Sequence, residues 1–126
     1  IGSDSGVIEF GVGNPHCRNY GTYPRVFARY VREKKILTVE DAVRKMTSLP
    51  AEALRLPDRG RIEPGFWADL VVFDLDTIQD TSTYTKPHQY PDGIAYVLVN
   101  GRVAAAGGTV TGVLAGRVLY GPGRSQ

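Results

Sequence analysis

A tight turn that runs straight into a short apolar segment, between residues 59 and 74, constrains the fold of this chain more than any other feature. Pro64-Gly65 is typical of a turn. The run from Leu70 to Phe73 is β-rich and too short for a helix, so it predicts a buried strand. The part of the chain after Pro57 is therefore expected to be mainly β-structure.

A hairpin is the next strong local prediction. Asn100-Gly101 separates two β-rich runs, 94–99 and 102–106, and suits the positive φ that both residues of a tight hairpin turn require. Residues 109–119 are broken by glycines and are expected to add at most one more short strand, whereas 76–92 are expected to form a polar loop. Such a small sheet has open edges and a thin core, so both halves of the chain are expected to need further cover.

Helices are predicted before this β-rich part. The first is expected to begin with Thr22 as its N-cap and Pro24 in its first turn, where proline is tolerated. Thr38 and Ser48 are expected to cap two further helices. Residues 1–21 lack a helical period and predict a strand end followed by a long loop, and loops of this length are often functional.

Length, charge and cysteine content narrow the class of protein. The 126 residues suffice for one domain, and a formal charge of +2 gives no argument for nucleic acid or an anionic membrane as a partner. No apolar run approaches the roughly 20 residues that span a bilayer. Cys17 is the only cysteine, which fits a reducing compartment, and a cytoplasmic location is expected. Because the chain starts with Ile1, we expect it to be a piece of a longer protein.

A series of short segments, spread in order over almost the whole chain, carries a family resemblance. They are Gly2-Ser-Asp-Ser5, Pro15-His-Cys-Arg18, Gly21-Thr-Tyr-Pro-Arg-Val26, Tyr30-Val-Arg-Glu33, Lys45-Met-Thr-Ser-Leu-Pro-Ala51, Asp58-Arg-Gly-Arg-Ile62, Ala68-Asp-Leu-Val-Val-Phe-Asp74, Gly93-Ile94 and Val99-Asn-Gly101. Together they resemble the C-terminal portion of D-aminoacylases, the N-acyl-D-amino-acid deacylases of the amidohydrolase superfamily. Residues 68–74 are widespread in that superfamily, whereas 15–26 point to this family within it.

The resemblance implies an α+β fragment: the end of a (β/α)8 metal-dependent amidohydrolase barrel, followed by part of a β-sandwich domain. Residues 1–58 would be the last barrel strand, the active-site loop and the closing helices. Residues 59–126 would be the C-terminal part of the sandwich. The histidine and cysteine ligands of the metal, and the N-terminal share of the sandwich, would come from the missing N-terminal part of the same enzyme.

The resemblance also implies a reaction. The parent protein would be a zinc-dependent hydrolase that cleaves the amide bond of small N-acyl-D-amino acids, giving a carboxylate and a D-amino acid, and this piece is expected to be inactive alone. One alternative is an amidohydrolase acting on cyclic amides, similar to dihydroorotase or hydantoinase. Another is a non-catalytic α+β module that binds a partner through its sheet edge.

Asp4 is the candidate catalytic residue. It stands at the end of a predicted strand just before a loop, which is where barrel enzymes place catalytic groups. The resemblance implies that Asp4 lies at the metal centre, contacts the metal, and passes a proton from the attacking water to the leaving amine. Taken without the resemblance, it is an ordinary turn aspartate between Gly2 and Gly6.

Arg18 and His16 are the candidate substrate-binding residues. The resemblance places a carboxylate-binding arginine at Arg18, and a guanidinium can bind the α-carboxylate of an N-acyl amino acid with two parallel hydrogen bonds. His16 could orient the substrate or bind the metal, although a lone histidine favours a structural role. Cys17 replaces the proline of the family's His-Pro-Arg motif and is expected to be a packed free thiol.

Three polar residues farther along the chain are expected to be solvent-exposed or to serve local structure. His88 lies in a proline-flanked polar loop and is expected to be simply exposed. Asp69 and Asp74 bracket the predicted strand 70–73, and hydrogen bonding at the turn and strand ends is a better account of them than metal binding.

Overall fold

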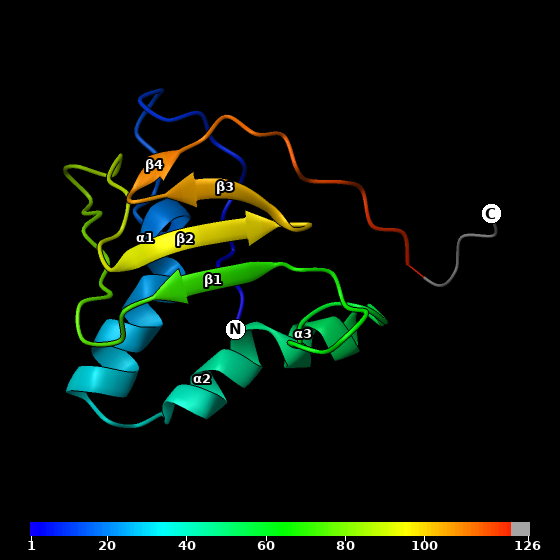
Figure 1. Cartoon of the computed structure of the whole chain (residues 1–126). Helices are drawn as coiled ribbons and strands as arrows, with labels where there is room; N and C mark the ends of the chain where they lie inside the picture. The colour runs from blue at the N-terminus through cyan, green and yellow to red at the C-terminus, as the bar shows by residue number, and fades with distance from the viewer. Residues whose placement is uncertain (122–126) are drawn as a thin grey trace.

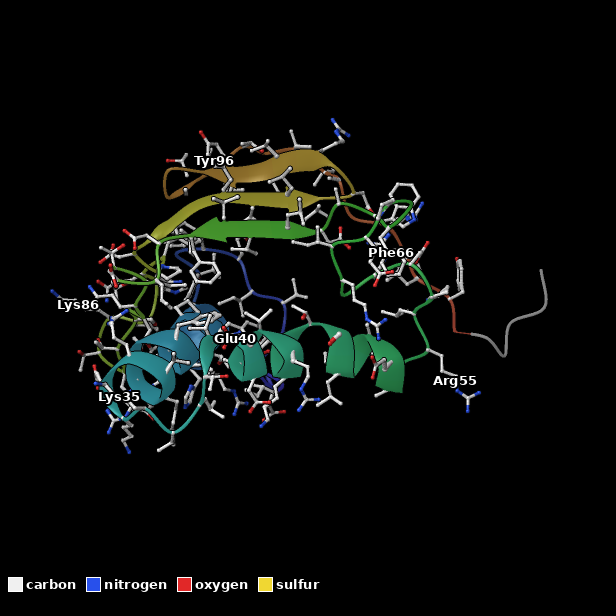
Figure 2. All side chains as sticks on the ribbon, turned by 60° about the horizontal axis from the view of Figure 1, so that its bottom comes forward. Lys35, Glu40, Arg55, Phe66, Lys86 and Tyr96 are labelled. Carbon is white, nitrogen blue, oxygen red and sulfur yellow. The ribbon has the colours of Figure 1, made fainter. Side chains whose placement is uncertain are left out.

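The computed structural model of the protein describes residues 1–121. Within this range a layer of helices packs under one face of an antiparallel sheet (Figures 1 and 2). The helices are α1 (Arg18–Arg25), η1 (Val26–Glu33), α2 (Val39–Met46) and α3 (Ser48–Ala53). The strands are β1 (Leu70–Phe73), β2 (Ile94–Val99), β3 (Arg102–Ala106) and β4 (Thr109–Val110), in the spatial order β1-β2-β3-β4. Residues 122–126, the end of the segment predicted to belong to a sandwich, lie outside the described residues.

The sheet confirms the positions of the predicted strands, but the prediction that 70–73 is buried is wrong, because Val71 and Val72 at the centre of β1 are 52% and 50% exposed. Asn100 and Gly101 both have positive φ, 49° and 79°, and join β2 to β3 as a tight hairpin. Residues 109–119 contribute only β4, which pairs with the end of β3. The long segment between β1 and β2 returns the chain to pair antiparallel, and within it Gln79 and Asp92 form an isolated bridge.

The first helix begins earlier than predicted. The amide of Gly21 donates to the carbonyl of Cys17 at 3.0 Å, so helical bonding already starts ahead of Arg18. Thr22 is therefore inside the helix, and its hydroxyl donates to the Arg18 carbonyl at 2.8 Å instead of capping. Pro24 is also interior, where it removes a backbone donor. The helix continues as η1, a π-helix.

The two following helices differ in how they begin. Thr38 caps α2 as predicted, because its hydroxyl accepts the Asp41 amide at 3.1 Å. The cap position of α3 is Thr47 and not Ser48, since the Ala51 amide bonds to the Thr47 carbonyl at 3.1 Å. The hydroxyl of Thr47 donates back to Val43 at 2.7 Å, so α3 begins without a side-chain cap.

Helices and sheet share one core. Val26, Phe27, Ala42 and Ile78 are buried together, and they come from η1, α2 and the segment after β1. The Phe27 ring lies 4.7 Å from that of Phe73 at the end of β1. Burying such a side chain stabilises the fold by about 2–3 kcal/mol. η1 and α2 therefore pack against the end of β1, the start of β2 and the segment that follows β1.

The opposite face of the sheet is open. Val72 and Tyr96, which face each other across β1 and β2, remain 50% and 49% exposed. Figure 2 shows Tyr96 on the side away from the helices. The strand predicted at the N-terminus is not formed within residues 1–9, because a barrel strand exists through hydrogen bonds to neighbouring strands and the described chain offers none there. None of the described helices is long and apolar enough to cross a membrane.

Candidate functional site

Asp4 and Arg18 meet at the two ends of the long N-terminal loop. A carboxylate oxygen of Asp4, Oδ2, lies 3.0 Å from Nη1 of Arg18, which is the first residue of α1. Both side chains are largely accessible, 88% for Asp4 and 44% for Arg18. Asp4 has a φ of 50°, a left-handed conformation that is uncommon outside glycine and is often found at functional sites. The loop thus presents an acid and a cationic fork side by side.

His16 supports the start of the first helix. Its Nδ1 atom accepts the Arg18 amide at 3.0 Å, and its ring packs edge-on against Tyr84 at 5.1 Å between centroids. The side chain is exposed. These contacts are structural, which is the role that a lone histidine favours. Both hydrogen bonds involve Nδ1, and no hydrogen bond of Nε2 is found among the described residues. The assignment of His16 to the substrate pocket stays a prediction.

Potential metal ligands are dispersed over the part of the chain that the structure describes. Among residues 1–121 no group of three or more histidine, cysteine, aspartate or glutamate side chains is placed to hold a metal ion. Asp4 stands alone as a carboxylate beside Arg18, and a zinc site needs about four donors. The described residues therefore do not form a zinc site by themselves.

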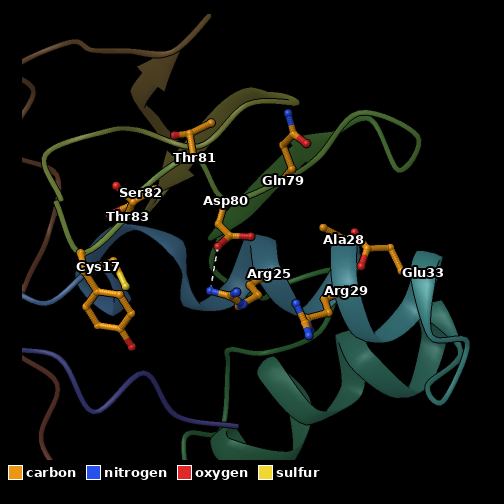
Figure 3. Close-up of a pocket in the computed structure, with 11 residues that line it drawn as sticks. Cys17, Arg25, Ala28, Arg29, Glu33, Gln79, Asp80, Thr81, Ser82 and Thr83 are labelled. Atoms are coloured by element: carbon orange, nitrogen blue, oxygen red, sulfur yellow. Dashed lines mark ion pairs between the residues drawn. The ribbon is translucent and has the colours of Figure 1, made fainter. Parts of the chain in front are cut away.

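A cavity of about 350 Å³ lies between the helices and residues 79–84 (Figure 3), and its helical wall is formed by Cys17 and Arg25 together with residues of η1. Arg25 pairs with Asp80 across it at 3.1 Å. Gly21 permits this approach, because a Cβ there would lie 2.9 Å from that of Asp80. Cys17 also lines the cavity and is the buried free thiol that the sequence predicted.

The two aspartates around β1 act at the turn and strand ends, as predicted. The Asp69 carboxylate accepts a hydrogen bond from the Arg59 guanidinium and another from the Asn100 amide, the latter at 2.8 Å. Asp74 accepts the Asp76 amide at 2.9 Å. These carboxylates are engaged in local structure, which accounts for them without a metal.

The prediction for His88 is wrong. The ring is half-buried and hydrogen-bonded to Gly11, Gly13 and Tyr20, all of which belong to the N-terminal loop or to α1. Two of these partner atoms are backbone atoms about 75 residues away in the sequence. No local pattern around His88 could have indicated them.

Known proteins resemble this chain over most of its length. The model of the amidohydrolase family matches residues 1–105. N-acyl-D-glutamate deacylase from Alcaligenes xylosoxydans xylosoxydans is 53% identical over 88 residues, which are 70% of this chain and 18% of that protein. The crystal structure of a D-aminoacylase superposes with a TM-score of 0.81 at 44% identity, over 83% of this chain and 22% of that one.

A second solved structure adds a bound metal. It is N-acyl-D-glutamate deacylase from Bordetella bronchiseptica, complexed with zinc and a phosphonate inhibitor that mimics the tetrahedral intermediate of the reaction. It superposes with a TM-score of 0.71 at 48% identity, over 72% of this chain and 19% of that one. The chain thus spans about a fifth of the length of the relatives that it matches. With the family model matching residues 1–105, this chain belongs to the amidohydrolase family.

Proposed function

We propose that this chain is the C-terminal portion of a zinc-dependent hydrolase that cleaves the amide bond of N-acyl-D-amino acids, releasing a carboxylate and a D-amino acid. The observation that carries the proposal is the pairing of Asp4 with Arg18 at 3.0 Å, inside the region matched by the family and by N-acyl-D-amino-acid deacylases. An acid beside a carboxylate-binding fork suits a substrate whose scissile amide lies one carbon from a carboxylate.

The roles of the residues follow from this chemistry. Arg18 would bind the substrate's α-carboxylate through its planar guanidinium, and His16 would line the same pocket next to it. Asp4 would take a proton from the attacking water and give it to the departing nitrogen, so that the amine leaves neutral. The high exposure of Asp4 and Arg18 supports this, since a substrate can reach both.

Zinc would require other parts of the protein. Asp4 could contribute one oxygen ligand, but the described residues lack the rest of a coordination sphere. We propose that the remaining ligands come from the N-terminal part of the same enzyme, which also makes this 126-residue piece inactive alone.

The domain layout and the cellular location belong to the same proposal. Residues 1–58 would form the last barrel strand, the active-site loop and the closing helices, and 59–126 part of a β-sandwich. The open face around Val72 and Tyr96 supports a further layer of chain on that side. The buried free thiol of Cys17 supports a cytoplasmic location, which fractionation of the native host would test.

The test is an assay of the full-length protein, purified with zinc, on paired N-acetyl-D- and N-acetyl-L-amino acids with acidic and apolar side chains. Release of free D-amino acid, in large excess over the L product, is expected. Dihydroorotate and a hydantoin serve as cyclic-amide substrates in the same assay. Turnover of these alone would replace the proposal by the cyclic-amide alternative, and turnover of none would favour the non-catalytic module.

A further inference from the structure

The long loop between Asp4 and Arg18 is held by His88, a side chain from the segment between β1 and β2. The Gly11 amide donates to Nδ1 of His88 at 3.1 Å, and Nε2 of His88 lies 3.0 Å from the Gly13 carbonyl. The Tyr20 hydroxyl lies 2.9 Å from the same Nδ1 atom. One imidazole therefore connects the tip of the loop to α1, the helix that begins with Arg18.

These contacts fix the state of the ring. A backbone amide can only donate, so Nδ1 of His88 carries no hydrogen, and Nε2–H donates to the Gly13 carbonyl. The Tyr20 hydroxyl must then donate to Nδ1 as well. Burial and, secondarily, the neighbouring Tyr90 raise the pKa of the Tyr20 phenol above its ordinary 10.0, so this hydroxyl keeps its hydrogen at neutral pH.

Aromatic rings close the same junction. Phe10, at the tip of the loop, stacks on Tyr90 with centroids 4.8 Å apart and contacts the edge of His88 at 5.6 Å. Elsewhere the loop has little apolar anchoring, since Val7 is fully exposed and Val12 is 58% exposed. The tip of the loop is thus held by the contacts that Phe10, Gly11 and Gly13 make with residues 88–90, while nearer its start the Asn19 side chain of α1 donates to the Gly6 carbonyl at 2.9 Å.

We propose that His88 is a positioning residue that holds the Asp4–Arg18 loop against α1. It thereby sets the distance between the Asp4 carboxylate, the proposed acid, and the Arg18 guanidinium, which is proposed to bind the substrate's carboxylate. We call the contacts of His88 with Gly11, Gly13 and Tyr20 the His88 clamp. The clamp itself follows from these contacts, whereas its effect on turnover rests on the proposed function. His88 does not reach the reacting atoms in this scheme. It acts through the loop backbone and through Tyr20, two residues after Arg18 in α1.

The first arm of the test needs no activity. Hydrogen exchange by mass spectrometry is measured on peptides covering residues 6–14 in the full-length protein, for wild type, His88→Ala and Lys86→Ala. Lys86 is a matched control in the same loop, with an exposed side chain. His88→Ala is expected to speed exchange of this peptide about fivefold or more, as loss of a backbone hydrogen bond implies, while Lys86→Ala leaves it unchanged. Unchanged exchange in His88→Ala would overturn the clamp.

The second arm asks whether the clamp positions Arg18. The kcat/KM values are compared for an N-acetyl-D-amino acid and for its α-carboxamide, which cannot form the paired hydrogen bonds with Arg18. His88→Ala is expected to lower kcat/KM for the carboxylate about tenfold or more, with a clearly smaller loss for the carboxamide. Equal losses for both substrates would mark His88 as merely structural and refute the positioning role.

A second variant guards against misfolding. Tyr20→Phe keeps the ring packing and removes one donor to His88, so a smaller change in the same direction is expected in both arms. If no N-acyl-D-amino acid is hydrolysed by the wild type, the proposed function fails while the exchange arm still decides whether the clamp exists.

Discussion

The guanidinium of Arg59 donates a hydrogen bond to the side chain of Asn100 at 2.6 Å, across 41 residues of sequence. The same guanidinium pairs with Asp69, whose other oxygen accepts the Asn100 amide. Arg59 is 8% exposed, so this contact fastens the turn before β1 to the β2–β3 hairpin in a site largely closed to water.

Arg59→Met is expected to destabilise the fold by about 2–4 kcal/mol, because it leaves Asp69 and Asn100 without their buried partner. Urea unfolding followed by circular dichroism measures this loss. Arg61→Met is the matched control, since Arg61 pairs with Glu52 at the exposed surface and little change is expected. Equal midpoints for the two variants would contradict the importance of the Arg59 contacts.

Gly93→Ala is expected to be among the most damaging single substitutions. Gly93 has a φ of 78°, and a Cβ there would lie 2.4 Å from backbone atoms of Ile78. A loss of about 3 kcal/mol or more in urea unfolding is expected. Gly65→Ala separates the two causes, because Gly65 has a φ of 89° but open space around it, and about 1 kcal/mol is expected. Similar losses for both would exclude the steric contribution.

Asp41 should make stability depend on pH in the acid range. Its side-chain hydrogen bond from Lys45, and then that from Arg44, hold the pKa of Asp41 below its ordinary 3.8. A lowered folded-state pKa gives stability above 3.8 that is lost as pH falls through the folded value. Asp41→Asn should therefore lower the Tm at neutral pH, with the difference from wild type shrinking as the pH falls below 3.8 and through the lowered folded-state pKa of Asp41.

Glu40→Gln is the control for that measurement, because Glu40 is a neighbouring exposed carboxylate in the first turn of α2. A difference between wild type and Asp41→Asn that stays constant with pH would contradict the assignment to the Asp41 ion pairs.

Asp4→Asn tests the proposed proton transfer. In the full-length protein this change keeps the shape of the side chain but removes its basic oxygen, and under the proposed function kcat is expected to fall about 10²–10⁴-fold. Asp76→Asn, an exposed aspartate in the turn after β1, is expected to leave kcat unchanged. Retention of more than about a tenth of wild-type kcat by Asp4→Asn would exclude Asp4 as the general acid and base.

Much of the fold could be predicted because its signals are local. The strands from Leu70 and Ile94, the Asn100-Gly101 turn and the Thr38 cap depend on neighbouring residues, and the structure contains them all. The start of the first helix could not be predicted, since Gly21 and Pro24 disfavour helix by propensity. Tertiary contacts override them: Gly21 admits Asp80, and Val26 packs in the core.

The candidate site divides in the same way. Asp4 and Arg18 were each identifiable by residue type and by resemblance, and the structure brings them within 3.0 Å. His88 was not identifiable, because its partners are two backbone atoms and a hydroxyl far away in the sequence. A contact to backbone atoms leaves no signature in the residue types of its partners.

The packing of Phe27 against Phe73 bears on how enzymes of this kind could be recombined. A crossover between Leu56 and Leu70 would take Phe27 from one parent and Phe73 from the other. Each of the two rings would then pack against a surface that did not evolve with it. Chimeras that inherit η1 together with the sheet from one parent should accumulate in cells as folded protein, whereas those divided between residues 56 and 70 should be degraded.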